Sequence, residues 1–444
     1  MLHLGNARTA LFNWLHARHT GGETLLRIED TDESRGHPDW VDLIYRSLDW
    51  LGLGWDGEPT FQSARFDAHR ATAEDLYTRG LAYYCDCTRE DLDARNAARG
   101  EKTPGYDGFC RDRGLGPAPG RLLRFKVPHD APITRVDIIR GTTELDPATI
   151  EDFGILRGNG VPLYVFANAL DDIDDGITHV LRGEDHLANV PKQMLIRRAL
   201  GYEPPVWAHL PMIVNAQRKK LSKRRDKLAL AAYQDEGYLA EAMVNYLATL
   251  GWSPGGDDEI ATLPEMVTAF ELASVNSSPA MFDTKKLDAF NGHYIRELPV
   301  DELVARAKPF YDGPALVPMA EEVRTRVTRL DQIGALISFI DEPTITIDPE
   351  ALVRVQKLGP AAIEIVEDVA AVLATTPWEA DALLEAVRAV GEARGLALRK
   401  LDAPVRVAVS GKTVGPPLFE ALVVLGRDRT LERLAAFEDL LAES

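Results

Sequence analysis

The sequence predicts an α/β protein in which a parallel-sheet domain is followed by an all-helical region, and three observations support this. First, an amphipathic segment at residues 6–20 is followed at once by the short apolar run 24–30, a succession of helix and strand typical of parallel sheets. Second, strand-like runs return between residues 161 and 214. Third, strands nearly vanish beyond residue 235, and from about residue 300 the pattern is almost wholly amphipathic helix.

The middle of the chain differs in composition from both ends. Residues 41–51 and 67–82 have the apolar spacing of helices. From about 83 to 160 there are many Gly and Pro residues, with short strand-like runs at 122–127 and 136–141. We interpret this stretch as an insertion, after which the sheet resumes.

Polar residues follow the returning strand-like runs. We expect strands at 162–172 and 178–186, a helix at 187–201, and a strand at 206–215 that leads into a basic loop. Ligands bind beyond the carboxyl ends of parallel strands, so Glu29, which ends the first apolar run, is also well placed to contact one.

The composition is that of a globular enzyme with an acidic excess. The 444 residues are 45% hydrophobic and 27% charged, which excludes disordered, collagen-like and disulfide-framework classes. No apolar run approaches the ~18 residues of a membrane span, and the N-terminus lacks a signal-peptide pattern, so we expect no membrane partner and a cytoplasmic location. The net charge of −19 argues on its own against a nucleic-acid partner.

Two local features point the other way, toward phosphate. Residues 218–227 contain seven cations and one anion, a density that faces a polyanion unless it is a solvated loop. His3-Leu4-Gly5-Asn6 stands at the start of a predicted helix, where free N–H groups suit phosphate and glycine lets a flat ring approach. The alternative is that His3 is simply a terminal residue that has no function.

A third polar group could form a pocket for a small zwitterion. Its members are Tyr164, Asn168, Asp172, Arg182, Glu184, Asp185 and His186. Arginine holds a carboxylate through two parallel hydrogen bonds. The structural alternatives are that Tyr164 belongs to the core and that Arg182 forms an internal ion pair.

The three cysteines of the chain, Cys85, Cys87 and Cys110, fall within 26 residues. They are either reduced cytosolic thiols or a thiolate metal site that needs a fourth ligand. Tyr106 and Asp112 are the candidates near Cys110.

Taken together, these features resemble a known enzyme family. His3–Asn6 and Lys220–Arg224 resemble the HIGH and KMSKS signatures of class I aminoacyl-tRNA synthetases. The segments 2–32, 163–193, 210–226 and 282–295 are similar, in order, to blocks of bacterial glutamyl-tRNA synthetases.

The resemblance implies a two-step, ATP-dependent attachment of glutamate to tRNA-Glu, with Mg²⁺, through a glutamyl-adenylate. Whether tRNA-Gln is also charged stays open, and we expect a monomer. The implied catalytic residues are His3, Gly5, Lys220, Ser222 and Lys223. The implied ATP-binding residues are His3, Gly5, Asn6, Asp185, His186, Leu221 and Lys223. The implied glutamate-binding residues are Glu29, Tyr164, Asn168 and Arg182, the last on the substrate side-chain carboxylate.

The resemblance also implies a fold and a metal. We expect a Rossmann-like catalytic domain in two halves, 1–82 and 161–230, with an inserted α+β acceptor-binding domain at 83–160. A stem-contact region at 231–300 and an all-α anticodon-binding region at 301–444 follow. Some family members bind Zn²⁺ in the insertion with histidine or tyrosine as fourth ligand. The implied set here is Cys85, Cys87, Tyr106 and Cys110, with Tyr106 preferred to Asp112.

One departure concerns the start of the chain. The family normally has a strand and an Arg-x-Ala-Pro-Ser-Pro-Thr-Gly-like stretch before its first signature, whereas this sequence begins two residues before His3. We therefore expect the natural protein to extend upstream, and this chain to activate glutamate weakly.

Two rival functions are a non-catalytic tRNA-binding paralogue and an enzyme that glutamylates a tRNA base. The retained signatures argue against the first, and the helical segment 300–444 argues against the second.

Overall fold

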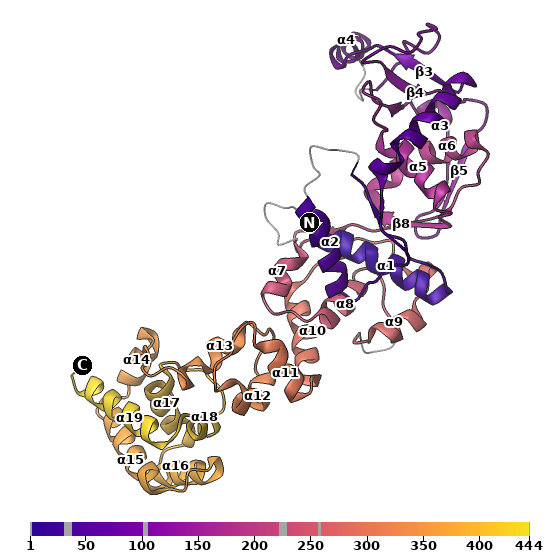
Figure 1. Ribbon diagram of the computed structural model, residues 1–444. Helices are drawn as coiled ribbons and strands as arrows, with labels where there is room; N and C mark the ends of the chain where they lie inside the picture. Colours follow the sequence, from indigo (N-terminus) through magenta and orange to yellow (C-terminus); the bar gives the residue numbers. More distant parts are fainter. Residues whose placement is uncertain (1, 31–37, 101–104, 222–228, 256–258, 444) are drawn as a thin grey trace. The chain divides into compact units, whose positions relative to one another are not determined.

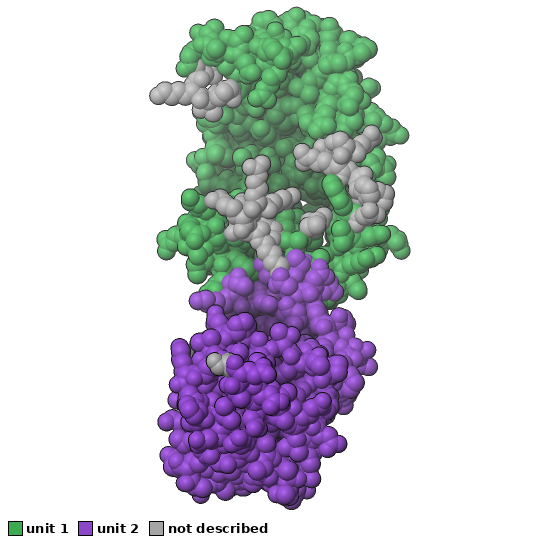
Figure 2. Space-filling view, turned by 90° about the vertical axis from the view of Figure 1, so that its left-hand side faces the viewer, with its two compact units in different colours: residues 1–231, 244–283 green, residues 232–243, 284–444 purple. Residues whose placement is uncertain are grey.

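The chain forms two compact units, each with its own hydrophobic core (Figure 1; Figure 2). The computed structural model describes residues 2–30, 38–100, 105–221, 229–255 and 259–443. Unit 1 comprises residues 1–231 and 244–283, and unit 2 comprises residues 232–243 and 284–444.

Unit 1 mixes helices with short strands. Its α-helices are α1 (Leu4–Thr20), α2 (Pro38–Trp50), α3 (Phe66–Thr78), α4 (Arg89–Arg99), α5 (Tyr164–Asp174), α6 (Val190–Leu200) and α9 (Leu263–Ala269). Its strands are β1 (Arg27–Ile28), β2 (Thr60–Phe61), β3 (Ala82–Cys85), β4 (Leu122–Phe125), β5 (Ile133–Asp137), β6 (Gly141–Leu145), β7 (Gly154–Leu156), β8 (His179–Gly183), β9 (Val206–Leu210), β10 (Ile213–Val214) and β11 (Ala280–Met281). Two short helices, α7 (Leu230–Asp235) and α8 (Ala240–Ala248), contribute residues to both units.

The four-stranded sheet with the order β6-β5-β9-β8 positions the site. Strands β5, β9 and β8 run parallel, and β6 is antiparallel to β5. The register pairs Arg182 of β8 with His209 of β9, which places both side chains on one face. Helix α1 lies against β8, and Asn13 donates to the carbonyl of Leu181 at 2.9 Å.

The remaining strands form smaller sheets. Strands β1 and β2 are a parallel pair, as are β10 and β11, while β3, β4 and β7 form an antiparallel sheet. Buried side chains of β4, β5, α5 and α6, among them Phe125, Ile133, Phe166 and Ile196, join these layers in one core. The Rossmann-like α/β character predicted from the sequence is therefore confirmed.

Two predicted strands were wrong. Residues 164–174 form helix α5, and the continuous burial of residues 166–172 explains the error, because a helix buried on most sides gives an apolar run that looks like a buried strand. The run 136–141 is also not a strand. Strand β5 ends at Asp137, and Asp137 Oδ1 accepts from the amides of Ile139 and Arg140, which turns the chain into β6.

Several other elements occur where the sequence predicted them. Helix α1 covers all of residues 6–20 and stops at Gly21, whose φ of 71° suits glycine at a helix end. Helix α6 falls within the predicted helix at 187–201, and the two turns of 3₁₀ helix before it, Glu184–Asn189, begin at the last three residues of the predicted strand 178–186.

Unit 2 is helical throughout its described part. Its further helices are α10 (Thr284–Glu297), α11 (Val300–Ala307), α12 (Leu316–Arg324), α13 (Gln332–Ile337), α14 (Pro349–Gln356), α15 (Ala361–Thr375), α16 (Ala380–Arg394), α17 (Leu398–Ser410), α18 (Leu418–Leu425) and α19 (Arg427–Ala442). Helix α15 packs on α19, α16 and α17 around buried Val366, Val387, Leu401 and Phe437. The predicted all-α region is thus confirmed, while the five-part division of the chain remains a prediction. Among the described helices, none has the length and apolarity to cross a membrane.

Candidate active site

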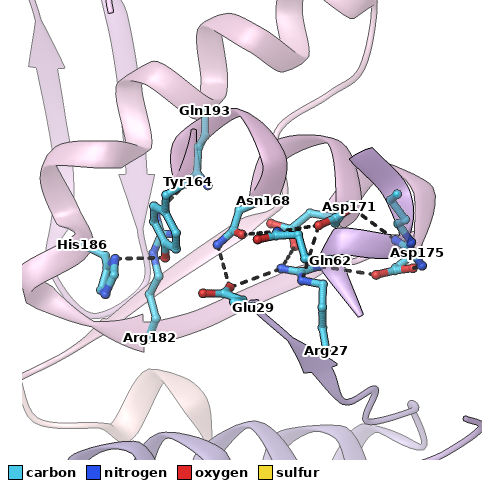
Figure 3. A network of polar contacts seen from close by, with 12 residues as sticks. Arg27, Glu29, Gln62, Tyr164, Asn168, Asp171, Asp175, Arg182, His186 and Gln193 are labelled. Atoms are coloured by element: carbon cyan, nitrogen blue, oxygen red, sulfur yellow. Dashed lines mark hydrogen bonds and ion pairs between the residues drawn. The ribbon is translucent and has the colours of Figure 1, made fainter. Parts of the chain in front are cut away.

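Glu29 and Asn168 form the centre of a polar network in unit 1 (Figure 3). Asn168 Nδ2 donates to Glu29 Oε1 at 2.8 Å, and Asn168 Oδ1 accepts from Gln62 Nε2 at 2.8 Å. The second contact fixes the orientation of the Asn168 amide, because an amide nitrogen facing Gln62 would place two donors together. Glu29 is thereby held just beyond the end of β1.

A second layer of charges supports this centre from α5. Arg27 of β1 forms ion pairs with Asp172 at 2.9 Å and Asp175 at 3.4 Å. Asp171 Oδ2 accepts from Gln62 at 2.6 Å. Burial alone would raise the pKa of Asp171, but hydrogen bonds from His69 and Gln62 outweigh burial and hold the pKa below its usual range. The carboxylate therefore stays ionised and fixes α5 against β1.

Tyr164 and His186 lie together on the other side of Asn168 (Figure 3). The Tyr164 hydroxyl is 3.1 Å from His186 Nδ1. Burial, aided by the negative charge of Glu29, raises the pKa of Tyr164 to about 12. Burial and the nearby Arg182 cation lower the pKa of His186. At neutral pH both groups are uncharged, and the tautomer of His186 decides which of the two donates.

Arg182 is half-buried and is fixed by uncharged partners. Its Nε lies 3.2 Å from His209 Nε2, and its Nη2 donates to Gln193 Oε1 at 2.7 Å. The guanidinium also lies over the ring of Trp207, 5.2 Å from the centroid. The carboxylates of Asp172 and Glu29 act on it through space.

The basic loop meets the same region through Lys220. Its ammonium pairs with Asp185 Oδ2 at 3.0 Å, and the backbone of Lys220 forms a bridge with Val214 at the end of β10. Leu221 donates to the carbonyl of Ile213 at 3.4 Å. Ser222 and Lys223 lie outside the described residues.

His3, Gly5 and Asn6 occupy the start of α1, as predicted. His3 caps the helix by accepting from the amide of Asn6 at 3.4 Å, and its backbone bridges Ala229. A Cβ atom at residue 5 would lie 3.2 Å from the His3 ring, so glycine leaves room for this arrangement.

The three cysteines converge in space. Their sulfurs lie within 4.8 Å of one another, and Cys87 Sγ is 3.5 Å from Cys110 Sγ. The Tyr106 hydroxyl accepts from the amide of Cys110 at 2.8 Å and interacts with the Cys85 thiol. Asp112, in contrast, pairs with Lys126 and has 86% of its side chain exposed.

The structure thus joins the predicted residues Glu29, Tyr164, Asn168, Arg182, Asp185, His186 and Lys220 in one connected set of hydrogen bonds, ion pairs and close charges. His3, Gly5 and Asn6 are positioned separately, by α1. Sequence reasoning missed the residues that support the site, among them Gln62, Asp137, Gln193 and His209. Each lies 11 or more residues from its partner here, and no local pattern marks it.

In comparisons with known proteins, the chain is similar to tRNA synthetases over nearly its whole length. Residues 1–289 match the family described as tRNA synthetases class I (E and Q), catalytic domain, and residues 302–437 match the anticodon binding domain family. The chain is 50% identical to the glutamate–tRNA ligase of Frankia casuarinae, over 99% of this chain and 96% of that protein. It is also 50% identical to the glutamate–tRNA ligase of Thermobifida fusca, over 100% of this chain and 96% of that protein.

A solved structure agrees with these relatives. The fold is similar to the crystal structure of a glutamate tRNA ligase from Elizabethkingia meningosepticum in complex with its amino acid. The TM-score is 0.87 at 29% identity, with 99% of this chain and 97% of that chain covered.

Proposed function

This chain belongs to the glutamate–tRNA ligase family of class I tRNA synthetases, and from that premise we propose which of its residues attach glutamate to tRNA-Glu. The activity is ATP-dependent and uses Mg²⁺. In the first step a glutamate α-carboxylate oxygen attacks the α-phosphorus of ATP and pyrophosphate leaves. In the second, a hydroxyl of the terminal tRNA ribose attacks the acyl carbon and AMP leaves.

The observation that carries the proposal is the placement of opposite charges around Asn168 and Tyr164. Glu29 presents a carboxylate on one side and Arg182 presents a guanidinium on the other. A glutamate between them can direct its ammonium group to Glu29 and its side-chain carboxylate to Arg182. Tyr164 and Asn168 then supply neutral hydrogen bonds that orient the molecule.

The cations of the signature loop act on the phosphates. Lys220 stands at the edge of the glutamate site, where its pairing with Asp185 holds it before ATP arrives. Lys220 and Lys223 would stabilise charge that develops on the triphosphate and the leaving pyrophosphate. His3, Gly5 and Asn6 would line the ATP site, where the start of α1 offers amide N–H groups to phosphate and Gly5 leaves space for a ring. Asp185, His186 and Leu221 complete the ATP-binding set, and Ser222 is the remaining residue of the signature.

The insertion would hold the acceptor end of tRNA. Arg70, Arg121 and Arg157 line a cavity of about 330 Å³ beside the backbone of Gly158 and Gly160. Three guanidinium groups against one carboxylate, that of Glu74, make this cavity attractive to backbone phosphate. The helical part of unit 2, which includes the match to the anticodon binding domain, would contact the anticodon.

The cysteine cluster fits a structural zinc ion. Thiolates on tetrahedral Zn²⁺ lie about 3.8 Å apart, since each Zn–S bond is about 2.3 Å. The three sulfurs here lie within 4.8 Å of one another, and Tyr106 brings an oxygen to the same cluster. Cys85, Cys87, Cys110 and Tyr106 would hold the ion, which would fix the loops of the insertion and take no part in the reaction.

The direct test is glutamate-dependent ATP–pyrophosphate exchange with tRNA-Glu present, followed by aminoacylation of purified tRNA-Glu and tRNA-Gln. We expect exchange and charging of tRNA-Glu by a cytoplasmic, monomeric enzyme, and size-exclusion chromatography reports the oligomeric state. Binding of tRNA-Glu without any exchange would contradict the proposal. The base-glutamylating alternative is not favoured, because that type of enzyme resembles only the catalytic half, whereas this chain continues through the anticodon domain.

A further inference from the structure

Behind Arg182 lies a buried pair of side chains, Asp137 and His209, that no step of the reaction uses. Both side chains are fully buried, and His209 Nδ1 is 2.5 Å from Asp137 Oδ2. The other nitrogen of the imidazole, Nε2, is 3.2 Å from Arg182 Nε. The three residues therefore form a chain of hydrogen bonds from the end of β5, across β9, to the guanidinium on β8.

The hydrogen bonds fix the tautomer of His209. Asp137 Oδ1 accepts from the amides of Ile139 and Arg140 at 3.0 and 2.8 Å. Burial alone would raise the pKa of Asp137, but the hydrogen bonds from His209 and from the Arg140 amide hold the pKa below its usual range. The carboxylate is thus an acceptor only, so His209 must carry its proton on Nδ1.

The other ring nitrogen of His209, Nε2, is then a hydrogen-bond acceptor. Burial and the adjacent Arg182 cation lower the pKa of His209, and they outweigh the hydrogen bond and charge of Asp137, which raise it. The ring is therefore neutral at pH 7. A neutral ring protonated on Nδ1 offers a lone pair at Nε2, which is what the Nε–H of Arg182 requires. The other tautomer would set two N–H groups against each other.

A neutral acceptor has a consequence for charge. A carboxylate in the place of His209 would hold Arg182 equally well, but it would offset the guanidinium charge and repel an acidic substrate. Gln193 and Trp207, the other supports of Arg182, are also uncharged. The guanidinium is therefore held in place while its positive charge remains available to a ligand.

We propose that Asp137 and His209 are positioning residues that set the preference for glutamate over glutamine, by holding Arg182 through a tautomer-locked neutral imidazole. The inference rests on the proposed function, because it assigns the substrate side-chain carboxylate to Arg182. Asp137 acts through His209, and neither residue touches the substrate.

Three variants test this. Asp137→Asn keeps an oxygen for the amides of Ile139 and Arg140 but turns an NH₂ toward His209, which moves the imidazole proton to Nε2 and against Arg182. His209→Gln keeps a donor toward Asp137 and an acceptor toward Arg182. The double variant Asp137→Asn/His209→Gln repeats the conflict of Asp137→Asn, because a glutamine that accepts from the asparagine NH₂ must turn its own NH₂ toward Arg182.

The measurements separate positioning from stability. The dissociation constants of glutamate and glutamine are measured by calorimetry on the full chain, and the glutamate KM and kcat by exchange with tRNA-Glu. Nitrogen NMR of ¹⁵N-histidine-labelled protein, with His209→Gln as the assignment reference, reports which ring nitrogen carries the proton. His179→Gln, at the start of β8, is the matched control, and thermal unfolding reports folding.

We expect Asp137→Asn to weaken glutamate binding about tenfold, through KM more than kcat, with glutamine binding nearly unchanged. We expect His209→Gln to stay within about threefold of wild type and the double variant to be as weak as Asp137→Asn. A His209→Gln variant as weak as Asp137→Asn would show a merely structural pair and overturn the proposal, as would an unchanged Glu/Gln ratio in Asp137→Asn. If wild type neither binds glutamate nor charges tRNA, the proposed function itself fails.

Discussion

Asn168 donates through Nδ2 to Glu29 Oε1 at 2.8 Å, although the two residues are 139 positions apart. This bond joins the end of β1 to helix α5. Its direction is set by Gln62, which occupies the oxygen of the same amide. Glu29 is consequently presented with one oxygen engaged, and its second oxygen can receive a substrate ammonium group.

Exchange of Asn168 for aspartate should disrupt this arrangement. Asn168→Asp keeps the acceptor for Gln62 but places a carboxylate against Glu29, and one of the two then takes up a proton or turns away. We expect the glutamate KM to rise about tenfold or more, with a smaller change in kcat. Asn276→Asp, in an exposed turn of the same unit, is the control because aspartate retains its acceptor role there. An unchanged KM would remove Asn168 from the glutamate site.

The lysine of the signature loop should matter for adenylate formation more than for tRNA binding. Lys220→Ala removes the cation beside Asp185, and we expect exchange to slow by about 10²-fold. We expect the same of Lys223→Ala. The affinity for tRNA-Glu, measured by filter binding, should change little. Lys219→Ala, the exposed neighbour in the same hairpin, is the matched control. Equal losses of exchange and tRNA affinity would contradict the assigned role.

The sequence predicted individual site residues from their local segments better than it predicted contacts between residues far apart in the chain. The residues Glu29, Tyr164 and Arg182 were identified because they lie in or at the end of strand-like runs, in blocks that resemble one family. Their mutual placement also needed the β8–β9 register and the true state of residues 164–174, a helix that its uniform burial disguised as a strand.

The supporting residues had no such signal. Asp137 and His209 are 72 positions apart, and Gln62 and Asn168 are 106 positions apart. Each is an ordinary polar residue in its own segment, and only the tertiary packing of β5 beside β9, or of α5 beside residue 62, makes it a partner. The acidic net charge was misleading for a similar reason, because it averages over surfaces that a local cation cluster does not share.

The zinc proposal predicts the behaviour of one cysteine. Wild-type protein purified without chelator should contain about one Zn²⁺ per chain by mass spectrometry. Cys110→Ser should bind well under half as much and unfold several degrees lower, because the loops around Cys85 and Tyr106 lose their anchor. Asp112→Ala is the control, since Asp112 faces solvent. Zinc-free wild type whose stability does not respond to added Zn²⁺ would contradict the proposal.

The arginine-lined cavity predicts a salt-dependent contact with tRNA. Arg157→Gln should weaken tRNA-Glu binding and lower the slope of log K against log[salt] by about one. Exchange at saturating tRNA should be nearly normal, since the cavity holds none of the glutamate-binding residues. Arg89→Gln, an exposed arginine of α4 that pairs with Asp93, is the matched control. An unchanged slope would place the tRNA backbone elsewhere.

The buried carboxylate of Asp171 predicts how stability depends on pH. Its pKa is lowered in the folded state, because the hydrogen bonds from His69 and Gln62 outweigh the effect of burial. The unfolded chain therefore takes up this proton first as the pH falls. The stabilisation is fully present above the ordinary aspartate value of about 4 and is lost as the pH drops through the lower folded value.

Asp171→Asn tests that sign. The amide keeps an oxygen for Gln62 or His69 but carries no charge, so we expect a loss of about 1–3 kcal/mol at pH 7 and a flatter decline of stability below about pH 4. Urea unfolding at a series of pH values measures both quantities. Asp67→Asn, an exposed position of α3, should leave the profile unchanged. A variant with the wild-type decline in acid would show that Asp171 does not titrate with folding, and that the network of Figure 3 is held by its arginines instead.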